Sequence, residues 1–462
     1  MRADWVEVEL GNIAEIISGK NQKDVIDEKG KYPIYGSAGV CGYATDYLCE
    51  AGTTIIGRKG TINKPIFTKE KFWNIDTAFG IWTGGEIDKK YLYYFCCGFD
   101  FNKLDKSTTI PSLAKRDLLK IQFPVCPLPE QRAIVAKIDE LFSELDNGIA
   151  NLKAAQAKLD IYRQAVLKQA FEGELTREWR ERQTDLPSGE LLLNEINKLH
   201  IILESSKKKI KTKVIGTPKK DDVPHSIPEK WLWCYLGEVT WFINGDRGKN
   251  YPNVNEYVSE GIPWINTGHI RPDGGLHERK MHYITQEKFD SLRSGKIQEG
   301  DLIYCLRGAT FGKTAFVKPF HQGAIASSLM IIRSTEKINK KYLYFYLTST
   351  EGKQQLLRFD NGSAQPNLSA ETVRKYVFPL PSLEEQTQIV QEIEARLSVC
   401  DKLAETIQTS LQQAEALRQS ILKKAFEGRL LTETELQTCK AQADWMPAEQ
   451  LLAQIKSTKA KG

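Results

Sequence analysis

Two long segments of the chain, residues 129–172 and 384–427, carry apolar residues at alternating steps of four and three positions. This spacing is typical of a coiled-coil seam, because it keeps one face of a helix apolar over many turns. The glycines that follow, Gly173 and Gly428, stand where a helix commonly ends in a left-handed residue. Each segment is therefore predicted to form one helix of roughly 65 Å. The predicted seam residues are Ile134, Ile138, Leu141, Leu145, Leu152, Leu159, Tyr162 and Val166 in the first segment, and Ile389, Ile393, Cys400, Leu403, Ile407, Ala414, Leu417 and Ile421 in the second.

The same stretch of sequence closes both segments. RQAVLKQAFEGEL (163–175) and RQSILKKAFEGRL (418–430) are near copies that lie 255 residues apart. The likeness continues upstream at shorter offsets, as between LGNIAEIISG (10–19) and LGEVTWFING (236–245). The chain is thus predicted to be a tandem duplication whose second copy carries insertions, and the repeat is far too long for a solenoid.

The remainder of each copy is predicted to be a mixed α/β globular domain, since it is rich in glycine and aromatic residues and contains β-like runs such as TTIIG and DLIYCL. A long helix with one apolar face needs a partner, and the two copies are the obvious partners for each other. The predicted fold class is α+β and multi-domain, with two globular domains separated by two long helices that pack as an antiparallel coiled coil. The alternative is that the long helices belong to the cores of two ordinary domains. The predicted segments are a first globular domain (1–125), a central long helix (126–175), a linker with a short helix and a lysine-rich stretch (176–225), a second globular domain (226–380), a C-terminal long helix (381–430) and a tail (431–462).

Composition limits the classes of function. The chain is 41% hydrophobic and 27% charged, as in a soluble globular protein, and its net charge of +5 permits DNA binding without arguing for it. The amino terminus lacks the apolar stretch of a signal peptide, and no apolar run is long enough to span a membrane. The nine cysteines are scattered without zinc-site spacing, so we expect free thiols in the cytoplasm and no metal centre.

Motifs for catalysis fail on inspection. RGATFGKT (307–314) has one residue too few between its glycines to wrap a phosphate as a P-loop does. PDGGLHERK (272–280) holds a nuclease-like set of charges, but the first copy has no counterpart. Neither of the Asn-Pro-Pro-Tyr and Asp-Pro-Pro-Tyr motifs of amino-methyltransferases is present. A duplicated protein whose copies share no catalytic constellation is expected to be a binding protein and not an enzyme.

The copies do share an Arg–x–x–Thr–x–x–Lys pattern that follows an apolar strand. Arginine can read guanine with two hydrogen bonds, whereas threonine and lysine suit phosphate oxygens. The alternative is an exposed basic turn around a structural glycine. The candidate DNA-binding residues are Arg58, Lys59, Thr61 and Lys64 in the first copy, and Arg307, Thr310 and Lys313 in the second.

Two unlike globular domains, each followed by a similar long helix that closes on AFEGEL or AFEGRL, resemble the specificity subunit of a type I restriction-modification system. The helix starts PLPEQ (127–131) and PSLEEQ (381–386) add to the resemblance, which covers essentially the whole chain. The globular domains match only in outline, as expected of domains that read different DNA sequences.

The resemblance implies that the globular domains are target recognition domains, each reading one half of a split, asymmetric site on double-stranded DNA. It implies a subunit without catalysis or cofactor of its own. S-adenosylmethionine, ATP and Mg²⁺ are expected on partners, namely two methyltransferase (modification) subunits and the restriction or translocase subunits. The residues leave two alternatives open: a coiled-coil adaptor that links two protein-binding modules, and an enzyme with an unrecognised active site.

Overall fold

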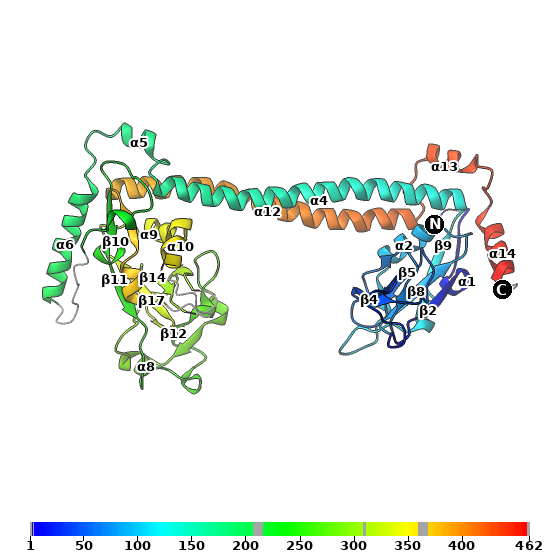
Figure 1. Cartoon of the computed structure of the whole chain (residues 1–462), viewed down its shortest axis with the longest axis horizontal. Coiled ribbons are helices and arrows are strands. Elements are labelled where there is room, and N and C mark those ends of the chain that lie inside the picture. Colours follow the sequence, from blue (N-terminus) through cyan, green and yellow to red (C-terminus); the bar gives the residue numbers. More distant parts are fainter. Residues whose placement is uncertain (1, 3, 207–215, 308–310, 359–367, 460–462) are drawn as a thin grey trace. The chain divides into compact units, whose positions relative to one another are not determined.

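The computed structural model describes residues 2, 4–206, 216–307, 311–358 and 368–459. The chain divides into two compact units: unit 1 comprises Met1–Ala154 with Thr406–Gly462, and unit 2 comprises Ala155–Glu405. Helices α4 (Leu128–Phe171) and α12 (Leu383–Phe426) are each continuous, and each contributes one part to either unit (Figure 1). Because both long helices are shared between the units, the two units do not follow the six segments predicted along the sequence. Those segment boundaries stay a prediction.

Unit 1 contains a four-stranded sheet in the order β2–β8–β5–β6, a three-stranded sheet in the order β4–β3–β7 and the strand pair β1–β9. Its elements are β1 (Val6–Glu9), α1 (Leu10–Ile13), β2 (Ala14–Ser18), β3 (Tyr32–Gly36), β4 (Gly39–Ala44), β5 (Thr54–Gly57), β6 (Ile66–Phe67), β7 (Trp73–Asn74), β8 (Ala78–Thr83), α2 (Lys89–Gly98), η1 (Phe101–Leu104), α3 (Lys115–Leu118), β9 (Gln122–Val125), α13 (Glu433–Lys440) and α14 (Ala448–Lys459), with parts of α4 and α12.

Unit 2 repeats this plan, with sheets in the orders β11–β17–β14–β15 and β13–β12–β16 and the pair β10–β18. In both units the larger sheet is antiparallel throughout, and the smaller one has one antiparallel and one parallel neighbour pair. Its elements are α5 (Arg177–Glu181), α6 (Gly189–Ser206), η2 (Lys220–Asp222), β10 (Leu232–Tyr235), α7 (Leu236–Val239), β11 (Thr240–Asn244), η3 (Val254–Glu256), β12 (Ile262–Ile265), η4 (Thr267–His269), η5 (Glu278–Lys280), β13 (His282–Ile284), α8 (Gln286–Ser291), β14 (Leu302–Cys305), β15 (Thr314–Phe316), β16 (Ala324–Ile325), β17 (Leu329–Ser334), α9 (Lys340–Thr348), α10 (Thr350–Arg358), α11 (Ala370–Arg374) and β18 (Val377–Leu380).

The start of each long helix is anchored by the repeated Glu-Gln pair. Gln131 and Gln386 are buried, and their side-chain oxygens accept hydrogen bonds from the backbone N–H of Asp88 and Asn339, at 2.8 Å in both cases. Asp88 and Asn339 in turn cap the N-termini of α2 and α9. Each long helix is therefore fixed to the globular domain that precedes it in sequence.

The far end of each long helix closes with the same local geometry. Gly173 and Gly428 adopt φ of +79° and +75°, and the residue after each glycine donates its N–H to the carbonyl of Gln169 or Lys424. This is the helix-ending arrangement expected of a left-handed glycine. Phe171 packs in the core of unit 2 against Tyr342 and Tyr346, so the end of α4 is held by the second globular domain.

Within each unit the two long helices pack side by side, and thirteen of the sixteen predicted seam residues are buried or partly buried. Ile138 and Ile393 are fully buried, whereas Tyr162, Leu403 and Leu417 are 44%, 48% and 52% exposed. The second line of the seam lies one residue later than predicted. Its members are partly or fully buried: Phe142, Ile149, Gln156 and Arg163 on α4, and Leu397, Ala404, Leu411 and Arg418 on α12.

One arginine of each long helix lies in this second line of the seam. Arg163 pairs with Asp401 of the other helix at 2.7 Å in unit 2, and Arg418 pairs with Asp146 in unit 1. The two arginines occupy equivalent positions of the repeat, as do the two aspartates. In both units the long helices are therefore antiparallel, and they share one register.

The helices that follow the long helices also repeat. α6 buries Leu192 and Ile196 in the core of unit 2, and α14 buries Leu451 and Ile455 in the core of unit 1. No helix in the described part of the chain combines the length and the apolar character that crossing a membrane requires.

Candidate nucleic-acid interface

Arg58 lies in the loop that leaves strand β5 in unit 1. Its backbone N–H donates to the carbonyl of Thr77 at 2.7 Å, and its side-chain Nη1 donates to the carbonyl of Asp76 at 3.3 Å. The guanidinium carbon lies 5.7 Å from the centre of the Phe79 ring. A guanidinium has five N–H donors, so Arg58 is oriented by these contacts and keeps donors for a ligand.

A second segment, residues 105–116, which we call the strap, lies along the Arg58 loop. The N–H of Leu113 donates to the carbonyl of Arg58 at 2.9 Å, and the N–H of Gly60 donates to the carbonyl of Pro111 at 2.9 Å. Lys59 and Ser112 also form an antiparallel bridge. The loop and the strap are therefore one connected piece of backbone.

Asp105 organises the strap. Its Oδ1 accepts hydrogen bonds from the Ser107 hydroxyl at 2.7 Å and from the backbone N–H groups of Ser107 and Ser112, both at 3.0 Å. These bonds, that of the Ser107 hydroxyl foremost, lower the pKa of the Asp105 carboxyl. The strap is thus held in a fixed turn by an ionised aspartate.

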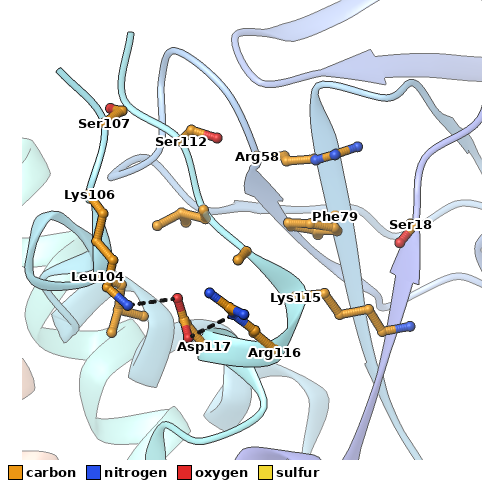
Figure 2. A pocket seen from close by; sticks show the side chains of 12 residues that line it. Ser18, Arg58, Phe79, Leu104, Lys106, Ser107, Ser112, Lys115, Arg116 and Asp117 are labelled. Atoms are coloured by element: carbon orange, nitrogen blue, oxygen red, sulfur yellow. Dashed lines mark hydrogen bonds and ion pairs between the residues drawn. The ribbon is translucent and has the colours of Figure 1, made fainter. Parts of the chain in front are cut away.

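Together the loop and the strap enclose an open hollow of about 530 Å³ (Figure 2). Figure 2 shows Arg58 beside Phe79, with Lys106 and Arg116 both directed at Asp117. Asp117 lies 3.4 Å from the ammonium of Lys106 and 3.7 Å from Nε of Arg116. The residues lining the hollow are Ser18, Arg58, Phe79, Leu104, Lys106, Ser107, Ser112, Leu113, Ala114, Lys115, Arg116 and Asp117.

The charge of the hollow favours an anion. Four cationic side chains line it against the single carboxylate of Asp117. The side chains of Lys106 and Arg116 are 75% and 81% exposed, so their ion pairs with Asp117 are screened by water and contribute little to stability. A hollow whose lining carries excess positive charge raises the local concentration of a polyanion such as DNA.

The structure separates the predicted residues of the first copy. Lys59 and Thr61 are exposed on the Arg58 loop. Lys64 lines a different hollow, of about 720 Å³, between the globular domain and the long helices of unit 1, where Tyr94 and Phe142 also lie. Arg58 and Lys64 therefore do not act on one ligand group, although they are only six positions apart in sequence.

In the second copy only part of the candidate site can be compared. Arg307 is half-buried, Lys313 is exposed, and Thr310 lies outside the described residues. The N–H of Leu368 donates to the carbonyl of Leu306 at 3.0 Å, which matches the bond from Leu113 to Arg58 to within one residue. In both units, a backbone hydrogen bond therefore joins the loop that carries the arginine to the segment that carries Leu113 or Leu368.

Sequence reasoning missed the strap residues. Pro111 and Leu113 have counterparts in Pro366 and Leu368, and this repetition indicated a shared scaffold and not a site. The available signal was the cluster of basic residues just before and after that motif, at Lys106 and Lys115–Arg116. No group of three or more histidine, cysteine or acidic residues suited to a metal ion occurs in the described ranges.

Comparison with known proteins places these features in a family. A family model described as the type I restriction modification DNA specificity domain matches residues 2–154 and 228–413. The type I restriction enzyme EcoBI specificity subunit of Escherichia coli is 25% identical over 482 aligned residues, which span 99% of this chain and 92% of that protein. The two matched ranges of the family model coincide with the two copies of the duplication.

Solved structures show the same fold. A chain from a structure described as the basis of complex assembly and conformational transition of the type I R-M system has a TM-score of 0.66 at 17% identity, over 93% of this chain and 99% of that one. The HsdS subunit from Thermoanaerobacter tengcongensis has a TM-score of 0.52 at 18% identity, over 93% and 98% of the two chains.

Proposed function

Because this chain belongs to the family of type I restriction modification DNA specificity domains, we propose that it is the subunit that selects the DNA sequence in a type I restriction-modification complex. The observation that carries this proposal is the duplication. Each unit holds one globular domain and equivalent parts of the two long helices, while the sequences around Arg58 and Arg307 differ. Such a molecule suits a bipartite, asymmetric DNA site, with one half read by each globular domain.

Arg58 is the side chain that we assign to base reading in the first half-site. Its contacts with Asp76 and Phe79 fix the plane of the guanidinium and leave donors at the rim of a basic hollow. A preoriented guanidinium suits the two acceptors of guanine in the major groove, and a good bidentate pair contributes about 1–3 kcal/mol of discrimination. Arg307 is the corresponding assignment for the second half-site, since it occupies the equivalent place in the repeat.

The chemistry belongs to partner subunits. The sequence contains neither an amino-methylation motif nor a P-loop, so methyl transfer, ATP hydrolysis and DNA cleavage require other chains. Two modification subunits would bring S-adenosylmethionine, and restriction or translocase subunits would bring ATP and Mg²⁺. Each copy of the repeat presents an equivalent surface on its long helix. Two equivalent surfaces suit the binding of two copies of one partner, the modification subunit.

The test is a methylome of the host, recorded before and after deletion of this gene. Loss of methylation at one bipartite motif, and its return when the gene is restored, is the expected result. Arg58→Ala should then relax the sequence of one half of that motif, and Arg307→Ala should relax the other half. An unchanged methylome after deletion would contradict the proposed function. If the motif depends on the gene but neither arginine variant alters it, the function stands and the base-reading assignment is wrong.

A further inference from the structure

We propose that the strap of unit 1 is a clamp for the DNA backbone, in which Lys106, Lys115, Arg116 and the Ser112 hydroxyl bind phosphate while Arg58 reads a base. The clamp rests on the proposed function, since it assumes that DNA lies against this face of the first globular domain. It adds a second class of contact, independent of sequence, which neither the family nor the repeat assigns.

The strap is built in advance of binding. Three hydrogen bonds to Asp105 close it, and its backbone is joined to the Arg58 loop on both sides of Ser112. A ligand held by the strap is therefore held at a fixed place relative to Arg58. Positioning of this kind is the role that phosphate contacts play in protein–DNA complexes, where they set the register for the groups that read bases.

The side chains of the strap have the chemistry of backbone contacts. Lys106 and Arg116 are exposed and weakly held by Asp117, so they can turn to a phosphate at little cost. Lys115 is exposed and lines the hollow without an ion pair to any described residue. Lysine, arginine and serine are among the side chains that contact phosphates in DNA, whereas the oriented guanidinium of Arg58 suits the two acceptors of a guanine.

The two copies differ at these positions, which makes the clamp a property of the first domain. The frame of the strap repeats in sequence, because Asp105, Pro111 and Leu113 correspond to Asp360, Pro366 and Leu368. The cations do not repeat. The counterparts of Lys106, Lys115 and Arg116 are Asn361, Ala370 and Glu371. The first half-site should therefore supply more of the salt-dependent binding than the second.

The experiment measures DNA binding by the complete complex with its methyltransferase subunits, as a function of salt. The ligands are a duplex with the bipartite site and a duplex of scrambled sequence. Lys115→Ala and Arg116→Ala should each weaken binding to both duplexes by a similar factor. Each should also reduce the slope of log affinity against log salt by about 0.9, so that between roughly 50 and 200 mM salt the wild type loses about 3.5-fold more affinity than either variant.

Matched controls separate the clamp from general loss of charge. Lys120→Ala and Lys375→Ala remove exposed lysines at equivalent positions of the two copies, just after the strap region, and should leave the salt slope unchanged. Lys115→Arg keeps the charge and should keep the slope. Neutral methylphosphonates placed in the first half-site should lower the slope more than methylphosphonates placed in the second half-site, and their effect should be smaller in the Lys115→Ala complex than in the wild type.

Four other outcomes would contradict either the clamp or the proposed function. If Lys115→Ala and Arg116→Ala weaken only the specific duplex and leave the slope intact, the strap reads bases and the clamp is refuted. No effect on either duplex also refutes it. If inorganic phosphate alone raises the melting temperature of the wild type but not of Lys115→Ala, while DNA binding is equal in both, the hollow is a small-anion site and not a backbone clamp. If the wild-type complex does not prefer the bipartite duplex, the proposed function itself has failed.

Discussion

The two anchors at the starts of the long helices differ in one respect, and this difference predicts unequal effects of the same substitution. Glu385 is buried and fully paired: Oε1 accepts from the Thr176 hydroxyl at 2.8 Å and from Arg180 Nη1 at 2.6 Å, and Oε2 accepts from the Trp231 indole at 2.8 Å. Among the described residues, the equivalent Glu130 accepts a hydrogen bond only from the Trp5 indole, at 3.0 Å. Its other oxygen is buried and has no hydrogen-bond partner among the described residues.

Glu385→Ala should therefore cost much more stability than Glu130→Ala. Glu385→Ala leaves the mostly buried guanidinium of Arg180 without its carboxylate partner. Breaking a buried ion pair in this way lowers the free energy of unfolding by about 3–5 kcal/mol. The second change removes one hydrogen bond and also removes a carboxylate oxygen that is already unpaired, so about 1–2 kcal/mol is expected. The difference of about 2 kcal/mol corresponds to roughly a 30-fold difference in local opening of the helix start.

Hydrogen exchange measured by mass spectrometry on the full-length protein reads the two anchors separately. Amides in the first turns of α12 should exchange faster in Glu385→Ala, and those in the first turns of α4 should change less in Glu130→Ala. Glu384→Ala, which removes the exposed neighbouring carboxylate, serves as the control and should leave both helix starts protected. Equal effects of the two anchor substitutions, or a larger effect of Glu130→Ala, would refute the reasoning from the hydrogen bonds.

Two further predictions concern the long helices and the response to pH. Insertion of one heptad at facing positions, after Leu152 in α4 and after Leu411 in α12, keeps the seam and lengthens each helix by about 10 Å. Methylome sequencing should then find both half-site sequences unchanged and the spacing between them altered by about three base pairs. A methylated motif with its original spacing would show that the helices do not set the distance. Glu351, hydrogen-bonded to His225 Nε2 at 2.6 Å, raises the pKa of that histidine, so the pair stabilises the fold fully below about pH 6.5 and loses this contribution as the pH rises through the raised value. His225→Gln should accordingly lower the melting temperature more at pH 6 than at pH 8, and an equal loss at both would contradict the assignment.

The long helices were predictable because their signals are local and repeated. Periodic apolar residues and the closing glycines placed them at 129–172 and 384–427, within one residue of α4 and α12. The second line of the seam was not predictable in this way. A search for apolar positions passes over Arg163 and Arg418, whose place at the seam depends on aspartates of the other helix.

The candidate site was predictable only in part, for a related reason. Arg58 was selected as a candidate because its loop follows an apolar strand and recurs in the second copy, and its role in DNA binding stays a prediction. The strap depends on Asp105, which bonds to residues two and seven positions away, and on backbone pairing with a loop about fifty residues earlier. Neither contact leaves a periodic pattern. Likewise, Lys64 lines another hollow, and its spacing from Arg58 in the sequence carries no information on that separation.

The repeat separates the residues that hold the fold from the side chains that we propose contact DNA. The Glu-Gln anchors, the closing glycines and the Asp–Pro–Leu frame of the strap occur in both copies, whereas the strap cations occur in one. In the first copy the frame acts through the Asp105 carboxylate and the backbone hydrogen bonds of Pro111 and Leu113, so it fixes the position of the strap whatever the exposed cationic side chains are. Lys106, Lys115 and Arg116 are exposed and take no part in that frame, so they can be exchanged without disturbing it. A protein built in this way can change the strength of its hold on each half of a DNA site independently, because the change requires only surface substitutions on a backbone that is already in place.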